Sequence, residues 1–204
     1  MIKNIILDWH GVLDKTSPKT LSPYLLKLFI IQLFKFNLTA CKQILFIIFD
    51  KYSDLINDYN RDAITPNEFW KLIYDNLGEK LGADLKAKTY QIEINSELVN
   101  FLKTRSENKY LLSDCSKDKK EIILNKLPDV NFRNKFFSCD SKTLKRDQSL
   151  FKFAINAGNI EPNKSLFIDD SMKNIEVARV LGFQTFLFTG TKNNLITLKL
   201  LLNE

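Results

Sequence analysis

The chain has 204 residues, with 45% hydrophobic residues, 30 basic and 24 acidic residues, and a formal net charge of +6. This hydrophobic content excludes a disordered chain, and the length suits one domain, or a compact domain with a sizeable insertion. The basic residues are spread along the chain without a dense block, which argues against a nucleic-acid partner. A net positive charge favours small anionic ligands where it is focused in a cleft.

The cysteines and the apolar segments limit the cellular compartments in which we expect the protein. The three cysteines, Cys41, Cys115 and Cys139, form no CxxC pair, which argues against a disulfide framework or a zinc site and fits a reducing compartment. No signal-peptide pattern is present at the N-terminus, so we expect a cytoplasmic protein. The apolar stretches 24–36 and 43–49 are short and interrupted by lysine or glutamine. We expect them to be packed helices and expect no membrane contact.

Short apolar runs typical of buried strands recur along the chain, at 3–8, 109–113, 136–140, 165–169 and 184–189. Helical patterns separate the last four, at 116–127, 147–158 and 172–182. Strands that alternate with helices predict βαβ units and a parallel sheet covered on both faces. The fold class is therefore expected to be α/β, with a Rossmann-like core.

A long helical insertion separates the first two predicted strands, which is too much chain for one crossover helix. The segment Thr65-Pro66-Asn67-Glu68 has the features of a helix start. We expect 15–95 to form a helical cap domain over the end of the sheet, and 1–14 with 96–204 to form the core domain. A further helical pattern at 94–109 leads back into the core.

Charged and polar residues stand at the ends of the predicted strands, or in the loop before a helix, namely Asp8, Ser113, Lys145, Asp169 and Asp170. Ligands of an open parallel sheet bind beyond the carboxyl ends of its strands, so we expect these residues to share one site. Carboxylates at close range repel one another unless a cation or a proton intervenes. Mg²⁺ is the expected cation, because it works with few carboxylates and a phosphate.

The same residues suit phosphoryl chemistry. With Mg²⁺ bound, one aspartate can remain an ionised nucleophile toward phosphorus. Ser113 and the amide groups after it, beginning with that of Asp114, lie at a helix start and suit phosphate oxygens. The side chain of Asp114 suits the helix start better than a ligand role. Lys145 can neutralise charge on the transferring group.

Four segments in order resemble the four motifs of the haloacid dehalogenase superfamily, and more closely its capped phosphatase-like branch. They are ILDWHGVLD (6–14), YLLSDCS (110–116), KRDQSLFKFAIN (145–156) and SLFIDDSMKNIEVARVLGFQTFLF (165–188). The resemblance implies a five-stranded parallel sheet in the order 5-4-1-2-3 with an inserted α-helical cap. It also implies that Asp8 attacks phosphorus and forms an aspartyl-phosphate.

The resemblance further implies the surroundings of Asp8. Mg²⁺ would be held by Asp8, the backbone carbonyl of His10, and Asp169 or Asp170, with the choice between these two left open. The phosphoryl oxygens would be held by Ser113 and the motif-three lysine. That lysine is assigned to Lys145, with Lys142 as the alternative, because Arg146 stands where proline is usual.

His10 is the only histidine of the chain. It stands where the superfamily normally has a second aspartate, which serves as acid and then as base. An imidazole can do both near neutral pH, and nearby carboxylates would raise its pKa while Mg²⁺ would lower it. A neutral imidazole hydrogen-bonded to the cap is the structural alternative.

The sequence therefore predicts a Mg²⁺-dependent phosphatase that acts on a small phosphorylated metabolite. One alternative is a catalytically impaired protein that keeps the fold for binding or regulation, with the apolar cap helices as a surface for a homodimer or partner. A metal-independent haloacid dehalogenase is the other alternative, and the adjacent pair Asp169-Asp170 argues against it.

Overall fold

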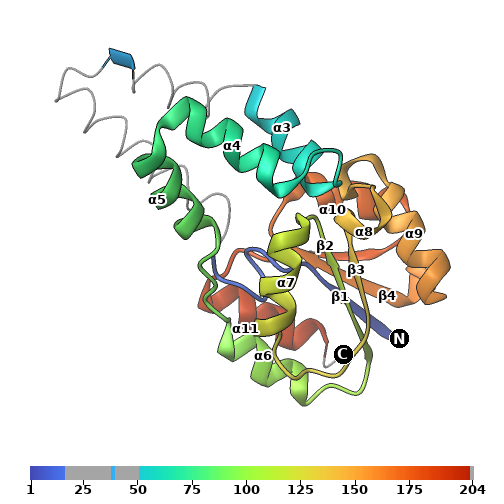
Figure 1. Ribbon diagram of the computed structural model, residues 1–204. Helices are drawn as coiled ribbons and strands as arrows, with labels where there is room; N and C mark the ends of the chain where they lie inside the picture. Colours follow the sequence, from blue (N-terminus) through green and yellow to red (C-terminus); the bar gives the residue numbers. More distant parts are fainter. Residues whose placement is uncertain (17–37, 40–50, 203–204) are drawn as a thin grey trace.

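The computed structural model describes residues 1–16, 38–39 and 51–202 (Figure 1). The helices predicted at 24–36 and 43–49, and Cys41, lie outside these residues. Within the described part of the chain, no helix combines the length and the apolar character needed to cross a membrane.

A five-stranded parallel sheet forms the centre of the molecule. Its strands are β1 (Asn4–Leu7), β2 (Asn108–Ser113), β3 (Phe132–Phe137), β4 (Ser165–Asp169) and β5 (Gln184–Leu187). Their order is β3-β2-β1-β4-β5, with every pair parallel. This is the predicted order read from the other edge, so the predicted fold class is confirmed. The central strand β1 pairs Leu7 with Leu111 on one side and with Ile168 on the other.

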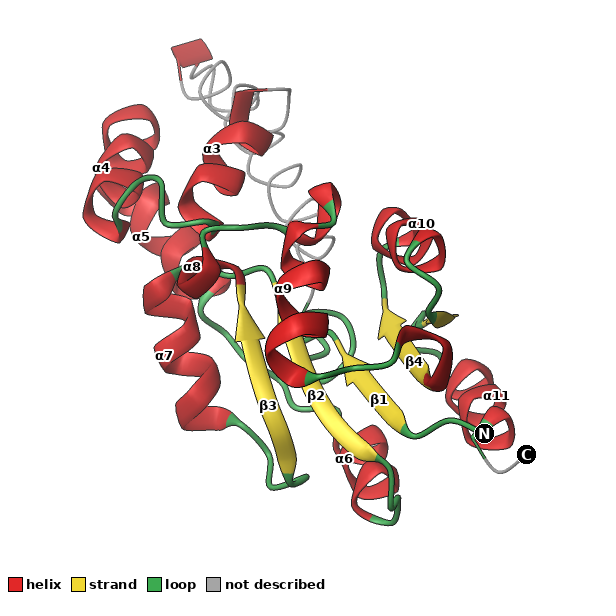
Figure 2. Cartoon of the chain, turned by 90° about the vertical axis from the view of Figure 1, so that its right-hand side faces the viewer, coloured by secondary structure: helices red, strands yellow, loops and turns green. Residues whose placement is uncertain are grey.

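Helices cover both faces of the sheet (Figure 2). One hydrophobic layer includes residues of α6 (Ser96–Lys103), α7 (Lys117–Lys126) and α11 (Lys192–Leu201), and the other includes residues of α9 (Ser149–Gly158) and α10 (Met172–Val180). Successive side chains of a strand point to opposite faces. Ile5 and Leu7 therefore pack in the first layer and Ile6 in the second. Three short elements lie in the connections, α8 (Ser138–Ser141), η1 (Lys145–Asp147) and η2 (Pro162–Lys164).

Within residues 51–202, three helices stand apart from the sheet, α3 (Lys51–Asn60), α4 (Pro66–Leu77) and α5 (Glu79–Thr89) (Figure 1). They have a hydrophobic cluster of their own, with buried residues Tyr59, Phe69, Trp70, Ile73, Leu77 and Leu85. Thr65 and Glu68 form a capping box at the start of α4, which confirms the predicted helix start. We call these three helices the cap helices. The cap boundaries at residues 15 and 95 stay a prediction.

The cap helices are attached to the core beside the ends of β2 and β3. The hydroxyl of Tyr59 donates to Asp118 of α7 at 2.7 Å, and the hydroxyl of Tyr90 donates to the same carboxylate. Ser138, which directly follows β3, donates to the carbonyl of Asn60 at 2.7 Å. The last turn of α3 is therefore hydrogen-bonded to the core at the carboxyl end of β3.

Two predicted elements differ from the structure. The strand predicted at 136–140 runs from Phe132 to Phe137, and α8 follows it at once. β3 is an edge strand whose residues 133–135 are exposed and polar, so a polar stretch separates Phe132 from the apolar end of the strand. The helix predicted at 94–109 is confined to α6, because Asn95 caps its start, Thr104 caps its end, and Asn108 already belongs to β2.

Candidate active site

Three carboxylates meet at the carboxyl ends of the two central strands. Asp8 directly follows β1, Asp169 is the last residue of β4, and Asp170 follows it. One ligand oxygen from each lies within 4.8 Å of the other two. Asp8 and Asp169 are buried, whereas Asp170 is partly exposed. An all-oxygen donor set of this size fits a hard divalent cation such as Mg²⁺.

Lys145 lies between two of these carboxylates. Its Nζ atom is 2.8 Å from Oδ1 of Asp8 and 2.8 Å from Oδ2 of Asp169, and its side chain is 2% exposed. Burial alone would lower the pKa of Lys145, but Asp169 and Asp8 raise it above its ordinary value. The alternative Lys142 is exposed. The structure therefore brings Lys145, and not Lys142, to the carboxylates.

Asp8 and Asp169 differ in how they are held. Burial raises the pKa of Asp8, and the charge of Asp169 adds to this effect while Lys145 opposes it. The carboxylate of Asp169 accepts hydrogen bonds at both oxygens, from the backbone of Ser171 at 2.7 Å and from Asn174 at 3.0 Å. These contacts fix the orientation of Asp169. A bound cation would favour the ionised form of Asp8.

Gly11 allows the loop after β1 to lie against Asp170. Its φ is +74°, and a Cβ atom at this position would lie 2.5 Å from Cγ of Asp170. No side chain fits in that space without moving the carboxylate. The glycine of the first motif thus positions Asp170 beside the segment that carries His10.

Ser113 closes β2 and is fully buried. Among the described residues its hydroxyl has no hydrogen-bond partner. A buried hydroxyl without a partner is costly, so an oxygen-rich ligand at this position would satisfy it.

Asp114 has a different environment. Its carboxylate accepts a hydrogen bond from the backbone amide of Lys145 at 3.1 Å. Burial raises the pKa of Asp114 to about 6, against the opposing charge of Lys145. The side chain thus holds the segment that carries Lys145, which leaves the backbone amide of Asp114 as its candidate contact with phosphate.

His10 is nearly buried, with 12% of its side chain exposed, and its Nδ1 atom is 3.4 Å from Oδ2 of Asp14. Burial, with a further contribution from the charge of Lys119, lowers the pKa of His10 to about 4, and the contact with Asp14 opposes this shift. His10 is therefore neutral near pH 7. The neutral form was the alternative left by the sequence, but its partner is Asp14, in the loop after β1, and not a residue of the cap helices.

Asp14 and Lys119 have no role in the sequence prediction. Asp14 belongs to the first motif, yet nothing in the sequence indicates that it contacts His10. Lys119 lies on α7, more than a hundred residues along the chain from His10, and affects the histidine only because the two are brought together in the fold. The spacing of four residues between His10 and Asp14 is the one sequence signal that could have indicated their contact.

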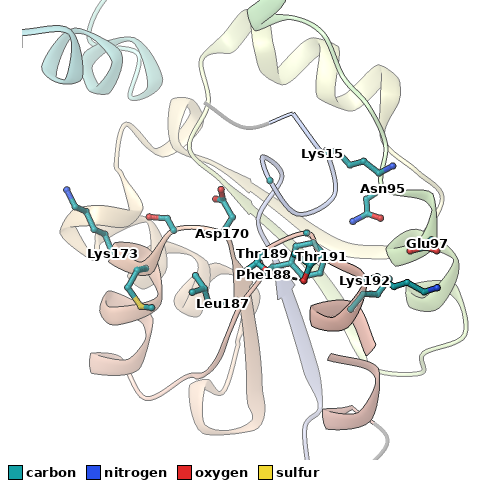
Figure 3. A pocket seen from close by; sticks show the side chains of 15 residues that line it. Lys15, Asn95, Glu97, Asp170, Lys173, Leu187, Phe188, Thr189, Thr191 and Lys192 are labelled. Carbon is teal, nitrogen blue, oxygen red and sulfur yellow. Dashed lines mark hydrogen bonds between the residues drawn. The ribbon is translucent and has the colours of Figure 1, made fainter. Parts of the chain in front are cut away.

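A cavity of about 1010 Å³ opens beside Gly11 and Asp170 (Figure 3). The loop after β5 and the first residues of α6, α10 and α11 bound it. Lys15, Lys173 and Lys192 line it together with Asp170 and Glu97. The cavity therefore carries three lysines around a space bordered by Asp170, whereas Asp8, Asp169 and Lys145 are not among the residues that line it. Cationic side chains favour an anionic ligand.

No protein-family model matches the chain. Among characterised proteins, it is 24% identical to a D-ribitol-5-phosphate phosphatase of Bacteroides thetaiotaomicron, over 91% of both chains. It is also 24% identical to the drimenol cyclase drtB of Aspergillus calidoustus. That match covers 67% of this chain but only 28% of the cyclase.

Solved structures with a similar fold cover nearly the whole chain. An HAD-family enzyme of B. thetaiotaomicron superimposes with a TM-score of 0.72 at 22% identity, over 96% of this chain and 98% of that one. The same enzyme in complex with magnesium and inorganic phosphate gives a TM-score of 0.71 at 21% identity, over 96% and 99%. A predicted HAD-like hydrolase of Porphyromonas gingivalis gives 0.69 at 21% identity, over 98% of both chains. The chain therefore has the haloacid dehalogenase-like fold that its four sequence motifs predict.

Proposed function

We propose that the protein is a Mg²⁺-dependent phosphatase that hydrolyses a small phosphorylated metabolite through an aspartyl-phosphate on Asp8. The observation that carries this proposal is the meeting of Asp8, Asp169 and Asp170 within 4.8 Å, with Lys145 between the first two. The similarity to a D-ribitol-5-phosphate phosphatase, and to an enzyme crystallised with magnesium and inorganic phosphate, supports it.

The donors for the metal are the carboxylates of Asp8, Asp169 and Asp170 and the backbone carbonyl of His10. Bound Mg²⁺ would neutralise charge on the phosphoryl group and orient it toward the nucleophile. Ser171 and Asn174 hold Asp169 in place for this role.

Asp8 acts as the nucleophile in this proposal. One of its carboxylate oxygens bonds to phosphorus as the bond from phosphorus to the leaving oxygen breaks, and the leaving oxygen takes up a proton from the solvent. Lys145, the hydroxyl of Ser113 and the amide of Asp114 bind the phosphoryl oxygens. Lys145 also keeps Asp8 oriented, because the two are 2.8 Å apart.

Hydrolysis of the aspartyl-phosphate completes the cycle. A water oxygen bonds to phosphorus, the bond from phosphorus to Asp8 breaks, and His10 accepts a proton from the water and then releases it to the solvent. A histidine that is neutral near pH 7 has a lone pair available for this base role. It is not an imidazolium, so it has no acidic proton to donate to the first leaving group. This differs from the double role, first acid and then base, that the motif position implies.

The cavity and the similarity to a D-ribitol-5-phosphate phosphatase indicate which compounds to test first as substrates. The cavity beside Asp170 carries lysines and hydroxyl side chains, which suits a phosphorylated molecule rich in hydroxyl groups. We therefore propose pentitol phosphates and sugar phosphates as the first compounds to test.

The test is release of inorganic phosphate from an aryl phosphate ester and from this panel, with Mg²⁺ and with EDTA. We expect Mg²⁺-dependent turnover by the wild type and a loss of at least about three orders of magnitude in Asp8→Asn. Asp75→Asn is the matched control, since Asp75 is an exposed residue of α4 paired with Lys71. Equal rates in the wild type and in Asp8→Asn would contradict the proposal.

One observation favours a second candidate, a protein that binds phosphate compounds with little turnover. His10 stands where the superfamily normally has an aspartate. It is neutral near pH 7, so it does not act as the general acid that protonates the leaving group. Binding of beryllium fluoride or inorganic phosphate with Mg²⁺, without turnover of any compound in the panel, would favour this candidate. Release of chloride from a haloacid in EDTA would instead indicate a dehalogenase.

A further inference from the structure

The loop that follows β1 is held together by its own backbone. The amide of Asp14 donates to the carbonyl of Trp9 at 2.9 Å, and the amide of Gly11 donates to the carbonyl of Asp14 at 2.7 Å. His10 and Asp14 also form an isolated bridge. The positions of these two residues relative to each other are therefore set by a closed turn and not by a flexible loop.

The carboxylate of Asp14 is fixed as firmly as its backbone. Its side chain is fully buried. Oδ1 accepts hydrogen bonds from the amides of Thr16 at 3.0 Å and Glu93 at 2.8 Å, and Oδ2 accepts from the hydroxyl of Thr16. Oδ2 also faces Nδ1 of His10 at 3.4 Å. Backbone donors do not change their place, so the carboxylate presents a fixed acceptor to the imidazole.

An ionised carboxylate accepts hydrogen bonds and cannot donate them, whereas a neutral imidazole carries its one proton on either nitrogen. A fixed acceptor at Nδ1 selects the form with the proton on Nδ1. The separation of 3.4 Å is longer than a strong hydrogen bond. Contacts of this kind in ligand-free sites commonly shorten when substrate binds.

We propose that Asp14 is a positioning residue that fixes the orientation and the tautomer of His10, with the proton on Nδ1 and the lone pair on Nε2. The catalytic consequence rests on the proposed function, because a lone pair on Nε2 is what a base toward water requires. The tautomer itself does not depend on any activity.

Asp14 also has a purely structural role, since it connects the amides of Thr16 and Glu93 on the two segments between the core and the predicted cap. Asp14→Asn separates the two roles. Its side-chain oxygen still accepts from both amides, but its NH₂ group can then face His10 and donate to Nδ1. The favoured proton position of His10 would therefore move to Nε2, by the same logic that governs a carboxylate behind a catalytic histidine.

The direct test is ¹⁵N NMR of the imidazole in the 204-residue chain, with and without Mg²⁺. The chain has one histidine, so the spectrum contains a single imidazole and needs no assignment. At mildly alkaline pH, where an ordinary imidazole is neutral, we expect the proton on Nδ1 in the wild type and on Nε2, wholly or in large part, in Asp14→Asn. Thr16→Val is the control, because it removes another hydrogen bond of the same carboxylate, and we expect it to keep the proton on Nδ1.

A proton on Nε2 in the wild type would overturn the proposal, and so would an unchanged tautomer in folded Asp14→Asn. If Asp14→Asn does not fold, the position of the proton in the wild-type spectrum tests the proposal alone.

The kinetic test uses any substrate found in the panel. We expect Asp14→Asn to lower kcat by about 10- to 100-fold with little change in KM, and to cause no further loss in a His10→Ala background. Losses that multiply in the double variant would show that Asp14 acts independently of His10 and would overturn the proposal. Failure of the proposed function would appear as absence of wild-type turnover, whereas failure of this inference would appear as the wrong tautomer.

Discussion

Gly11 lies directly against the carboxylate of Asp170, so that a Cβ atom on the glycine would be 2.5 Å from Cγ of the aspartate. The contact joins the loop after β1 to the residue after β4. It fixes the position of the Asp170 carboxylate relative to the loop after β1. The proposed metal donors are therefore positioned by the lack of a side chain at Gly11 as well as by hydrogen bonds.

Gly11→Ala should displace Asp170 and weaken Mg²⁺ binding. The new methyl group must move the carboxylate, and the backbone at φ +74° is strained for alanine at a cost of about 1–2 kcal/mol. We expect Mg²⁺ affinity, measured by calorimetry, to fall by at least about 10-fold, which corresponds to about 1.4 kcal/mol. Gly78→Ala is a matched control, because Gly78 has a φ of +77° and nothing within 4 Å. Equal Mg²⁺ affinity in the two variants would contradict the prediction.

Lys145→Met should destabilise the protein most strongly when no metal is bound. Lys145 is the buried cation between Asp8 and Asp169, and its loss leaves the carboxylates uncompensated. We expect the free energy of unfolding in urea with EDTA to fall by about 3–5 kcal/mol, with part of this recovered in Mg²⁺. Lys142→Met, at an exposed position nearby, should change it by less than about 0.5 kcal/mol. Similar losses in the two variants would refute the assigned role of Lys145.

Ser113→Ala should separate ligand binding from stability. The hydroxyl has no partner among the described residues, so its removal should leave the free energy of unfolding within about 1 kcal/mol of the wild type. Binding of inorganic phosphate with Mg²⁺ should weaken by about 10-fold. The contrasting variant is Ser138→Ala, which loses hydrogen bonds to the amide of Cys115 and the carbonyl of Asn60 and should be destabilised. Unchanged phosphate affinity in Ser113→Ala would show that this hydroxyl does not face the ligand.

Asp114 should make the metal-free protein less stable as pH rises from about 4 to about 6. Burial raises the pKa of Asp114 from 3.8 to about 6 in the folded state, so the folded protein binds more protons than the unfolded chain in this range. The stability that this proton contributes is present below the ordinary pKa and is lost as pH rises through the folded pKa, by up to about 3 kcal/mol. Asp114→Asn cannot ionise, so the difference in unfolding free energy from the wild type should grow over this range. Parallel pH profiles for the two proteins would rule out the shift.

The core and the carboxylate cluster could be predicted because each depends on local patterns that meet at one edge of the sheet. Apolar runs that end in Asp8 and Asp169 indicate strands, and parallel pairing brings such ends together. Thr65 and Glu68 likewise identify a helix start within four residues. These features need no knowledge of distant contacts.

Other features could not be predicted, because they depend on contacts between segments that are distant in the chain or on exposure. Residues 133–135 of β3 are polar and exposed on the edge of the sheet, so the hydrophobic pattern starts the strand four residues too late. The sign of the pKa shift of His10 depends on burial and on Lys119 of α7. The unpaired hydroxyl of Ser113 is likewise a property of the assembled site and not of the motif.

The bond from Tyr59 to Asp118 links two parts of the molecule that have different tasks. Asp118 stands five residues after Ser113, on α7, which begins four residues after the end of β2. The cap helices are therefore bonded to the same short stretch of chain that carries the proposed phosphate-binding hydroxyl of Ser113. Substitutions inside the aromatic cluster of the cap can thus affect the proposed phosphate site through the hydrogen-bonded carboxylate of Asp118. Under the proposed function, sequence changes in the cap would alter the affinity for phosphate as well as the choice of substrate.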